Sequence, residues 1–264
     1  TFHTLFTRYV HYARFVPKPL AKMGIVAYLR SFCRRADMII APSELARRVL
    51  RSWKVKQAIE VVPSGVDFSL LPDNRGDLRV RLRKQYHIPA NAPVLFYAGR
   101  MSREKNLPFL IEAFNKMRKT NGNLQLVLAG GGPFEKVLRH HHHKNIILTG
   151  EIKYPEILHY YCMGDIFVFS SLTETQGMVL AEAKANRLPV VALFAGGLCG
   201  TVRSGIDGYL VSRDHAAFIS HVERLLHDQD LIRKMSAAAY LDASERLSST
   251  VVAKKIESIY NSLI

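Results

Sequence analysis

Short apolar runs alternate with helical segments over most of this chain, and this alternation restricts the possible folds more than any other feature. Strands are expected at 94–99, 124–129, 145–149, 166–169, 189–193 and 208–211. Helices are expected between and after them, over 107–119, 133–139, 154–162, 177–186 and 214–227. Strands and helices that alternate in this way form a parallel sheet with covered faces. The sequence therefore predicts an α/β lobe with a doubly wound parallel sheet over residues 76–235.

Residues 1–75 are expected to form part of an earlier α/β lobe that ends in a linker. Phe2-His3-Thr4 reads as the exit of a strand, and further elements are expected as a helix over 20–35, a strand at 38–41, a helix over 44–53 and a strand at 59–62. Ser43 suits the N-cap of the second helix. Pro72 and Asp73-Asn74 mark a linker over 67–76. We expect this first lobe to be incomplete.

Two further helices are expected at the end of the chain, over 229–243 and 248–262. Residues 236–264 are expected to pack back toward the first lobe. Two α/β lobes in sequence would leave a cleft between them, in which a ligand could bind.

The most specific motif lies between two expected strands. Glu174 follows the strand at 166–169, Gly177 interrupts the segment, and Glu182 lies in the following helix. Ligands of open α/β sheets bind at the carboxyl ends of the strands, and a helix beginning near Gly177 offers free N–H groups to an anion. Eight helical steps span about 12 Å, more than the roughly 5 to 9.5 Å between the carboxylates of glycoside hydrolases. The spacing therefore favours an elongated ligand.

The segment 173–183 resembles the Glu-x7-Glu motif of retaining, nucleotide-sugar-dependent glycosyltransferases of family 4. The resemblance implies a GT-B fold, which consists of two Rossmann-like lobes. It also implies that Glu174 contacts hydroxyls of the donor sugar during catalysis and that Glu182 contacts the nucleotide ribose. Further donor-binding residues are then expected at Gln176, Gly177, Met178 and Val179.

A second group of candidate residues follows the expected strand at 94–99. Arg100 offers a planar fork and Lys105 a point charge, and both suit phosphate oxygens. The family has a similar Gly-Arg…Lys signature, which implies that these two residues bind the donor's phosphates during catalysis, with Gly99 beside them. Gly131, in a glycine-rich turn, and Glu151 match family positions near the nucleotide. A tight strand–helix turn is the alternative explanation of the glycines.

His3 is the candidate catalytic residue of the first lobe. Its context resembles the Phe-His-Thr of the family, where the histidine lies near the donor sugar and helps to hold the reacting geometry. With Tyr9, His11 and Tyr12, this region resembles glycosyltransferases that act on diacylglycerol. Residues 64–67 resemble the family's hinge. One departure is that the usual Pro-Glu pair after Gly196-Gly197 is replaced by Cys199-Gly200, so an acidic group is absent.

Positive charge is concentrated in the first part of the chain. The net charge is +15, and residues 1–90 hold 17 Lys/Arg against 6 Asp/Glu. Between residues 8 and 35 the basic side chains are interleaved with aromatic ones, which suits the surface of an anionic bilayer. A solvated basic face is the alternative explanation. The sequence has no recognisable nucleic-acid-binding motif, so nucleic acid is not expected as a partner.

Other features restrict the compartment and the chemistry. The chain has no stretch of about 18 uninterrupted apolar residues, and Cys33, Cys162 and Cys199 form no C-x-x-C pair. Such cysteine usage favours a reduced compartment, so we expect a cytoplasmic protein, peripheral on the inner face of the cell membrane. His140–His143 are expected to form an exposed loop, because consecutive residues cannot converge on one ion. No metal site is expected.

These observations favour a hexosyltransferase that moves a hexose from a nucleoside-diphosphate sugar to a membrane lipid such as diacylglycerol. A UDP-sugar is favoured as the donor, which is a substrate, and no cofactor is expected. Two alternatives stay open. One is the same transferase with a soluble or polyprenyl-linked glycan acceptor, and the other is a non-catalytic nucleotide-sugar-binding module. An incomplete first lobe could leave the chain inactive by itself.

Overall fold

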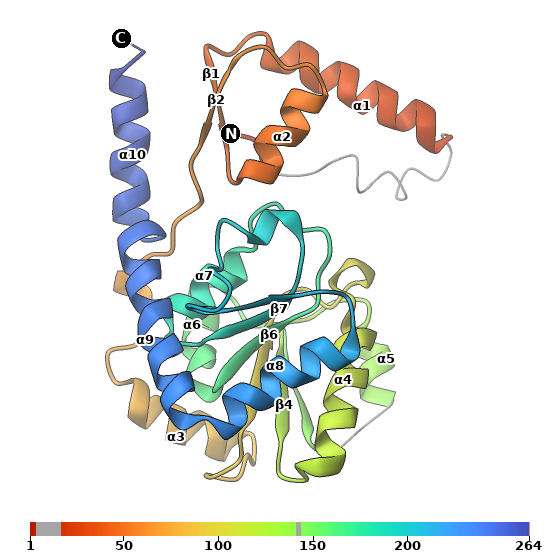
Figure 1. The fold of residues 1–264 in the computed structure, drawn as a ribbon, viewed down its shortest axis with the longest axis vertical. Helices are drawn as coiled ribbons and strands as arrows, with labels where there is room; N and C mark the ends of the chain where they lie inside the picture. The colour runs from red at the N-terminus through yellow and green to blue at the C-terminus, as the bar shows by residue number, and fades with distance from the viewer. Residues whose placement is uncertain (4–16, 141–143, 264) are drawn as a thin grey trace.

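The computed structural model describes residues 1–3, 17–140 and 144–263, which form two α/β lobes (Figure 1). The small lobe contains a two-stranded parallel sheet, with β1 (Met38–Ala41) beside β2 (Ala58–Val61). The large lobe contains a six-stranded sheet in the order β5-β4-β3-β6-β7-β8. Its strands, all parallel to their neighbours, are β3 (Val94–Ala98), β4 (Gln125–Ala129), β5 (Ile146–Gly150), β6 (Ile166–Phe169), β7 (Val190–Leu193) and β8 (Gly208–Val211). The predicted α/β class and parallel sheet are confirmed.

Helices cover both faces of the large sheet. The order of the strands reverses between β3 and β6, because the chain adds β4 and β5 on one side of β3 and β6 to β8 on the other. Such a switch point is where open α/β sheets bind ligands. The helices of this lobe are α3 (Arg75–Gln85), α4 (Leu107–Thr120), α5 (Glu135–His140), α6 (Ile157–Tyr160), α7 (Met178–Ala185), α8 (His215–His227) and α9 (Gln229–Arg246). Short 3₁₀ turns occupy Phe68–Leu70, Arg103–Lys105, Tyr161–Met163 and Gly196–Leu198.

Helix α3 was not expected from the sequence, where the linker at 67–76 led directly to the strand at 94–99. The helix lacks a clear apolar stripe because arginines face the protein interior. Arg83 is buried and donates to Asp165 Oδ2 at 2.9 Å and to the carbonyl of Met163 at 2.8 Å. Arg79 donates to Asp165 Oδ1 at 2.5 Å. Hydrogen bonds to a carboxylate and to carbonyls thus replace the apolar contacts that periodicity detects.

In the described part of the small lobe, two helices pack against the two strands. The helices are α1 (Lys18–Cys33) and α2 (Glu44–Ser52). Ser43 caps α2 by accepting a hydrogen bond from Ala46 N at 3.2 Å, as predicted. Phe2 is buried, donates its N–H to Ile40 O at 2.9 Å and packs edge-on against Trp53 with ring centroids 5.8 Å apart. These contacts fix the start of the chain beside β1.

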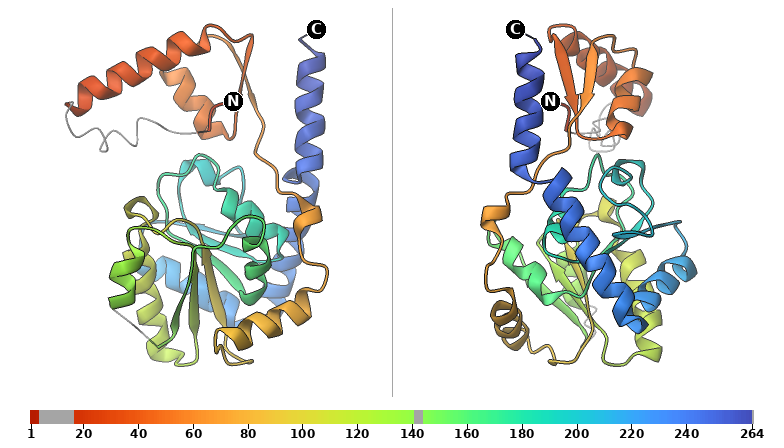
Figure 2. Two further views of the ribbon diagram at one scale, coloured as in Figure 1. Left: turned by 180° about the vertical axis from the view of Figure 1, so that it is seen from behind. Right: turned by 60° about the vertical axis from the view of Figure 1, so that its left-hand side comes forward.

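The last helix, α10 (Ser249–Asn261), lies beside the small lobe (Figure 2). Lys255 Nζ donates to Val61 O at 2.8 Å. At the crossing between the lobes, Val66 N donates to Leu247 O and Ser249 N to Val66 O, both at 2.8 Å. The preceding helix α9 packs on α7 in the large lobe and runs without interruption across the expected boundary at 235/236. The end of the chain therefore spans both lobes.

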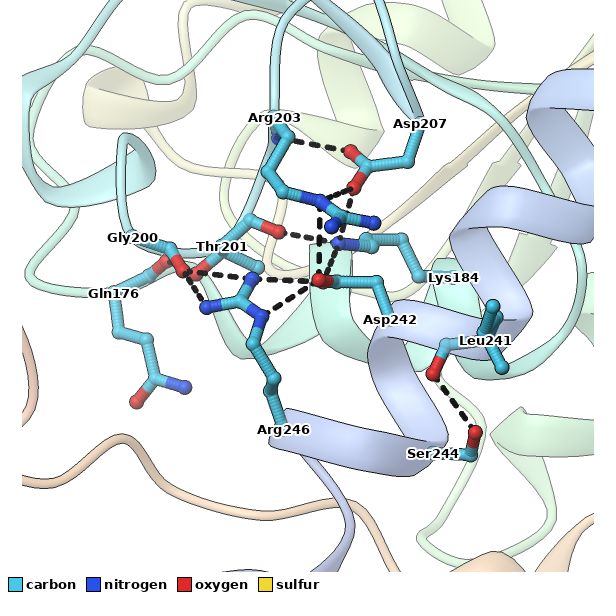
Figure 3. A network of polar contacts seen from close by, with 10 residues as sticks. All are labelled: Gln176, Lys184, Gly200, Thr201, Arg203, Asp207, Leu241, Asp242, Ser244 and Arg246. Carbon is cyan, nitrogen blue, oxygen red and sulfur yellow. Dashed lines mark hydrogen bonds and ion pairs between the residues drawn. The ribbon is translucent and has the colours of Figure 1, made fainter.

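A buried network of charges joins α7 to α9 (Figure 3). Lys184 is fully buried and donates to Asp242, to Asp207 at 3.0 Å and to Thr201 O at 2.6 Å. Arg246 donates from Nε to Asp242 Oδ1 at 2.6 Å and from Nη2 to Asp242 Oδ2 at 2.7 Å. Burial alone would raise the pKa of Asp242, but the hydrogen bonds from Arg246 and Lys184 outweigh it and hold that pKa below its usual range. The network also reaches the loop that carries Thr201.

We expect Lys184→Met to lower the free energy of unfolding by about 3 to 5 kcal/mol, since removal of one partner from a buried ion pair leaves uncompensated charge. Lys116→Met is the control, because its pair with Glu112 is about half exposed on both sides and should cost less than about 1 kcal/mol. Urea denaturation measures both values. Equal losses in the two variants would show that the buried network does not stabilise the lobe.

Candidate functional site

A hollow of about 600 Å³ opens at the carboxyl ends of β3 and β4, on one side of the switch point. Its lining includes six of the residues predicted from the sequence to bind the donor or act in catalysis: Gly99, Arg100, Gly131, Glu151, Val179 and Glu182. The remaining lining residues are apolar or glycine: Ala98, Ala129, Gly130, Gly132, Ile152 and Ile157. The hollow therefore brings together residues more than 80 positions apart in the chain.

Two glycine-rich turns cross closely to form the floor of this hollow. Gly130 has φ +134°, and a Cβ added to it would collide with the carbonyl oxygen of Gly99. Gly99 N donates to Ala129 O and Gly130 N to Gly150 O, each at 3.0 Å. A side chain at Gly130 would push these strand ends apart, so glycine is required there for the turns to approach each other.

Glu182 projects from α7 and is oriented by a tyrosine that the sequence analysis did not identify. Tyr161 is fully buried, and its hydroxyl donates to Glu182 Oε2 at 2.6 Å. Burial raises the pKa of Glu182, and the hydrogen bond from Tyr161 partly offsets that rise. One carboxylate oxygen is thus fixed by the protein, on a side chain that lines the hollow.

Lys105 and Glu174 meet at the ends of β3 and β6. Lys105 Nζ lies 2.6 Å from Glu174 Oε1, and the two side chains are only 20% and 15% exposed. Ser170 Oγ donates to Lys105 O at 2.7 Å, which ties the end of β6 to the turn that carries the lysine. Two residues that are 69 positions apart in the sequence thus form one ion pair, although neither lines the hollow itself.

The small lobe holds the segment that follows Glu174. Thr175 Oγ1 donates to His3 O at 3.0 Å, and Ser43 Oγ donates to Thr175 O at 2.5 Å. Gln176 is buried, accepts from Ser64 N at 2.8 Å and donates to Ser64 O at 2.9 Å. The structure therefore brings His3 beside the Glu174 segment through its carbonyl group. It directs the side chain of Gln176 to Ser64 rather than to the hollow.

Gly177 begins α7 in a left-handed conformation, with φ +76°. This places Met178 in the first turn, where N–H groups lack partners within the helix. The loop at 196–201 packs directly on this segment, since a Cβ on Gly197 would collide with Glu174 O. Cys199, at the position of the missing acidic group, is exposed.

Three residues contribute to this site in a way that the sequence did not indicate, although Ser43 was expected as an N-cap and Ser64 in the hinge. Ser43 and Ser64 contribute because they form hydrogen bonds with Thr175 and Gln176 of the large lobe. Tyr161 contributes because its hydroxyl, from the segment before β6, reaches Glu182 on α7. Within the described ranges, no group of three or more His, Cys, Asp or Glu side chains could hold a metal ion. The expected loop at His140–His143 lies mostly outside the described residues, with His140 ending α5.

We expect Gly130→Ala to lower the free energy of unfolding by about 3 kcal/mol, because the new methyl group collides with backbone at a positive φ. Gly122→Ala is the control, since a Cβ there meets nothing within 4 Å. Thermal or urea unfolding compares the two. A stable Gly130→Ala variant would mean that the two turns can separate without cost.

Models of two known protein families match most of this chain. The family model for glycosyl transferases group 1 matches residues 79–242, and the model for glycosyltransferase family 4 matches residues 1–70. The alpha-monoglucosyldiacylglycerol synthase of Streptococcus pneumoniae is 30% identical over 239 residues, which cover 88% of this chain and 54% of that protein. The synthase of the same name from Acholeplasma laidlawii is 25% identical over 276 residues, covering 100% of this chain and 69% of that protein. The chain thus spans about half the length of the pneumococcal relative.

Solved structures share the fold. The structure of HepE from Anabaena in complex with UDP and glucose has a TM-score of 0.80 at 21% identity, over 90% of this chain and 66% of that one. A sucrose-phosphate synthase from Thermosynechococcus elongatus has a TM-score of 0.82 at 24% identity, over 96% of this chain and 65% of that one. With the family matches, these likenesses lead to one conclusion: the chain belongs to the glycosyl transferases group 1 family and has the GT-B fold.

Proposed function

We propose that this chain belongs to a retaining hexosyltransferase that moves a hexose from a nucleoside-diphosphate sugar to a membrane lipid hydroxyl, such as that of diacylglycerol. The main support is the hollow at the carboxyl ends of β3 and β4. It is lined by Arg100 and Glu182 and by two glycine turns that approach each other closely. The names of the two relatives, alpha-monoglucosyldiacylglycerol synthases, favour this acceptor. The UDP and glucose in the HepE structure favour a UDP-hexose donor.

The donor would extend from the hollow to the Lys105–Glu174 pair. Its ribose hydroxyls would donate to Glu182, whose second oxygen is already occupied by Tyr161. The diphosphate would lie between Arg100 and the first turn of α7. The hexose would reach Glu174, and donor binding would then exchange the Lys105–Glu174 ion pair for contacts of Lys105 with phosphate and of Glu174 with sugar hydroxyls.

The chemical step breaks the bond between the anomeric carbon and the phosphate oxygen and forms a bond from that carbon to the acceptor oxygen on the same face. The acceptor's proton passes to the departing phosphate, so no protein base is required. Negative charge grows on the diphosphate, where Arg100, Lys105 and the start of α7 would stabilise it. His3, beside the Glu174 segment, would help to hold the sugar in place.

The small lobe would bring the acceptor to this site at an anionic membrane. Helix α1 exposes large apolar side chains, at Leu20, Met23, Tyr28 and Phe32, beside basic ones. Arg8 and Arg14 of the predicted basic region lie outside the described residues. No helix in the described ranges is both long and apolar enough to cross a membrane. We accordingly propose peripheral binding to the inner face of the cell membrane through residues 8–35.

We expect Glu174→Ala to lower the rate of hexose transfer to dispersed diacylglycerol by about 100-fold or more, because the sugar loses the group that orients it. The melting temperature should fall only modestly, because Lys105 loses its partner but keeps some exposure to solvent. Glu112→Ala on α4 is the control, since Glu112 is exposed and neither lines the hollow nor belongs to the Lys105–Glu174 pair. Labelled donor and thin-layer separation of the lipid product measure transfer.

The same assay decides between the acceptors. An unchanged rate of hexose transfer in Glu174→Ala would show that this residue has no catalytic role. Transfer only to a soluble or polyprenyl-linked glycan would replace the lipid acceptor, and donor binding without transfer to any acceptor would favour a non-catalytic module.

A second prediction concerns pH. Tyr161→Phe removes the hydrogen bond that lowers the pKa of Glu182, so that pKa should rise further. A protonated carboxyl no longer accepts two ribose hydroxyls, and protonation occurs below the pKa. The loss of UDP affinity on acidification should therefore begin at a higher pH in the variant. Calorimetric titrations with UDP between about pH 5 and 8 measure this, with Tyr86→Phe as the control. If UDP affinity depended on pH in the same way in Tyr161→Phe and in the unaltered protein, Glu182 would have no role in donor binding.

A further inference from the structure

A second hollow, of about 290 Å³, lies in the small lobe at the end away from the large lobe. The carboxyl ends of β1 and β2 lead to Ser43 and Ser64, which contact the large lobe. The hollow is formed instead by the segment before β2 and by the end of α1. Its lining consists of Arg30, Arg34, Lys54, Val55, Lys56 and Gln57. It is therefore distinct from the site for the donor.

The hollow is strongly cationic. Four of its six described lining residues are basic, and the other two, Val55 and Gln57, are uncharged. Within the described ranges, the head groups of Arg30, Arg34, Lys54 and Lys56 have no carboxylate partner. Like charges that share a small hollow repel one another, so an anion that entered it would be stabilised by all four. Arginine forks and lysine ammonium groups match the oxygens of a phosphate.

The protein holds this cationic segment in shape before any ligand binds. Arg51 Nη1 donates to Val55 O at 2.8 Å and to Gln57 O at 2.9 Å, so one guanidinium group holds both ends of the segment 55–57. Val55 is buried in the core of the small lobe. Lys54 is held in the left-handed region, with φ +60°. A turn fixed in this way loses little conformational freedom when a ligand binds.

Helix α1 connects the hollow to an apolar surface. Residues 20, 23, 27, 30 and 34 recur at spacings of three and four, so they form one stripe along the helix. Leu20 and Met23 are 59% and 67% exposed in the first half of the stripe. Arg30 and Arg34 reach the hollow in the second half. Apolar groups followed by cations along one line match the order of acyl chain and phosphate in a phospholipid.

From this arrangement we propose that the hollow binds the phosphate of an anionic membrane lipid, with Leu20 and Met23 in contact with the acyl region. This inference deepens the membrane-binding part of the proposed function, and it adds Lys54 and Lys56, outside residues 8–35, to the membrane contact. A specific phosphate site would set the depth and tilt of the small lobe at the bilayer, beyond the diffuse attraction of the basic region.

The test compares two pairs of charge-neutralising substitutions on the same helix. We expect Arg30→Gln with Arg34→Gln to weaken binding to phosphatidylglycerol vesicles by clearly more than the about 30-fold that two basic residues contribute through diffuse attraction. Lys18→Gln with Lys22→Gln removes the same charge from the basic region outside the hollow and should weaken binding by about 30-fold or less, the effect of diffuse attraction alone. Vesicle co-sedimentation at fixed salt measures both, and circular dichroism checks folding.

Two further variants keep the test decisive. Should the arginine pair disturb α1, Lys54→Gln with Lys56→Gln neutralises the other wall and should give a similar loss. Leu20→Ser with Met23→Ser should weaken vesicle binding but leave the cationic wall intact. Equal losses in the Arg30/Arg34 and Lys18/Lys22 pairs would indicate diffuse attraction and overturn the site.

A soluble source of phosphate is tested separately by calorimetry with glycerol 3-phosphate. Tight binding of this compound, lost in the arginine pair and accompanied by no binding to vesicles, would overturn the lipid assignment. Vesicle binding does not require sugar transfer. A chain that binds vesicles through this hollow but transfers no hexose would refute the proposed function alone, and active transfer with unchanged vesicle binding in the arginine pair would refute the lipid site alone.

Discussion

The segment Glu174–Gly177 is held by hydrogen bonds and close packing from both lobes, and the arrangement of the candidate site depends on this constraint. His3, Ser43 and Ser64 of the small lobe and hinge bind Thr175 and Gln176. On the other side, Thr201 Oγ1 donates to Gln176 O at 2.9 Å. The position of the Glu174 carboxylate is consequently linked to the relative position of the lobes. In enzymes whose domains close around a substrate, such a link allows the closing motion to complete the site.

The buried charge network extends this linkage into the large lobe. Lys184 bonds to the carbonyl of Thr201, and Thr201 in turn bonds to the Glu174 segment. Asp242 belongs to α9, which leads through Ser248 to α10 beside the small lobe. A buried lysine is tolerated here because two carboxylates and a carbonyl saturate its three donors. The same residues therefore connect the candidate site to the interlobe crossing.

Cationic side chains have different surroundings in the two lobes. In the large lobe, Lys105 lies beside a carboxylate and most of its surface is buried, so its charge is compensated within the protein. In the small lobe, Arg30, Arg34, Lys54 and Lys56 surround a hollow without an acidic lining residue. The uneven charge of the sequence thus corresponds to an uneven distribution in space, with the uncompensated charge at the end away from the candidate site.

Local sequence patterns were enough to predict the α/β class, the strands of the large sheet and the placement of Gly99, Arg100, Gly131 and Glu182 at one edge. Apolar runs and turn residues are local signals, and parallel strands must end at a common edge. The sequence did not reveal α3, because Arg83 is buried there and Arg79 is turned toward Asp165, and both interrupt the apolar period of the helix.

The partners of the buried polar groups became known from the folded structure and not from the sequence. It placed Tyr161 on Glu182, Gln176 on Ser64 and Lys184 between two aspartates. These pairs join residues from 21 to 112 positions apart. No local pattern records such pairs, because a buried polar side chain can be satisfied by any donor or acceptor that packing brings within reach.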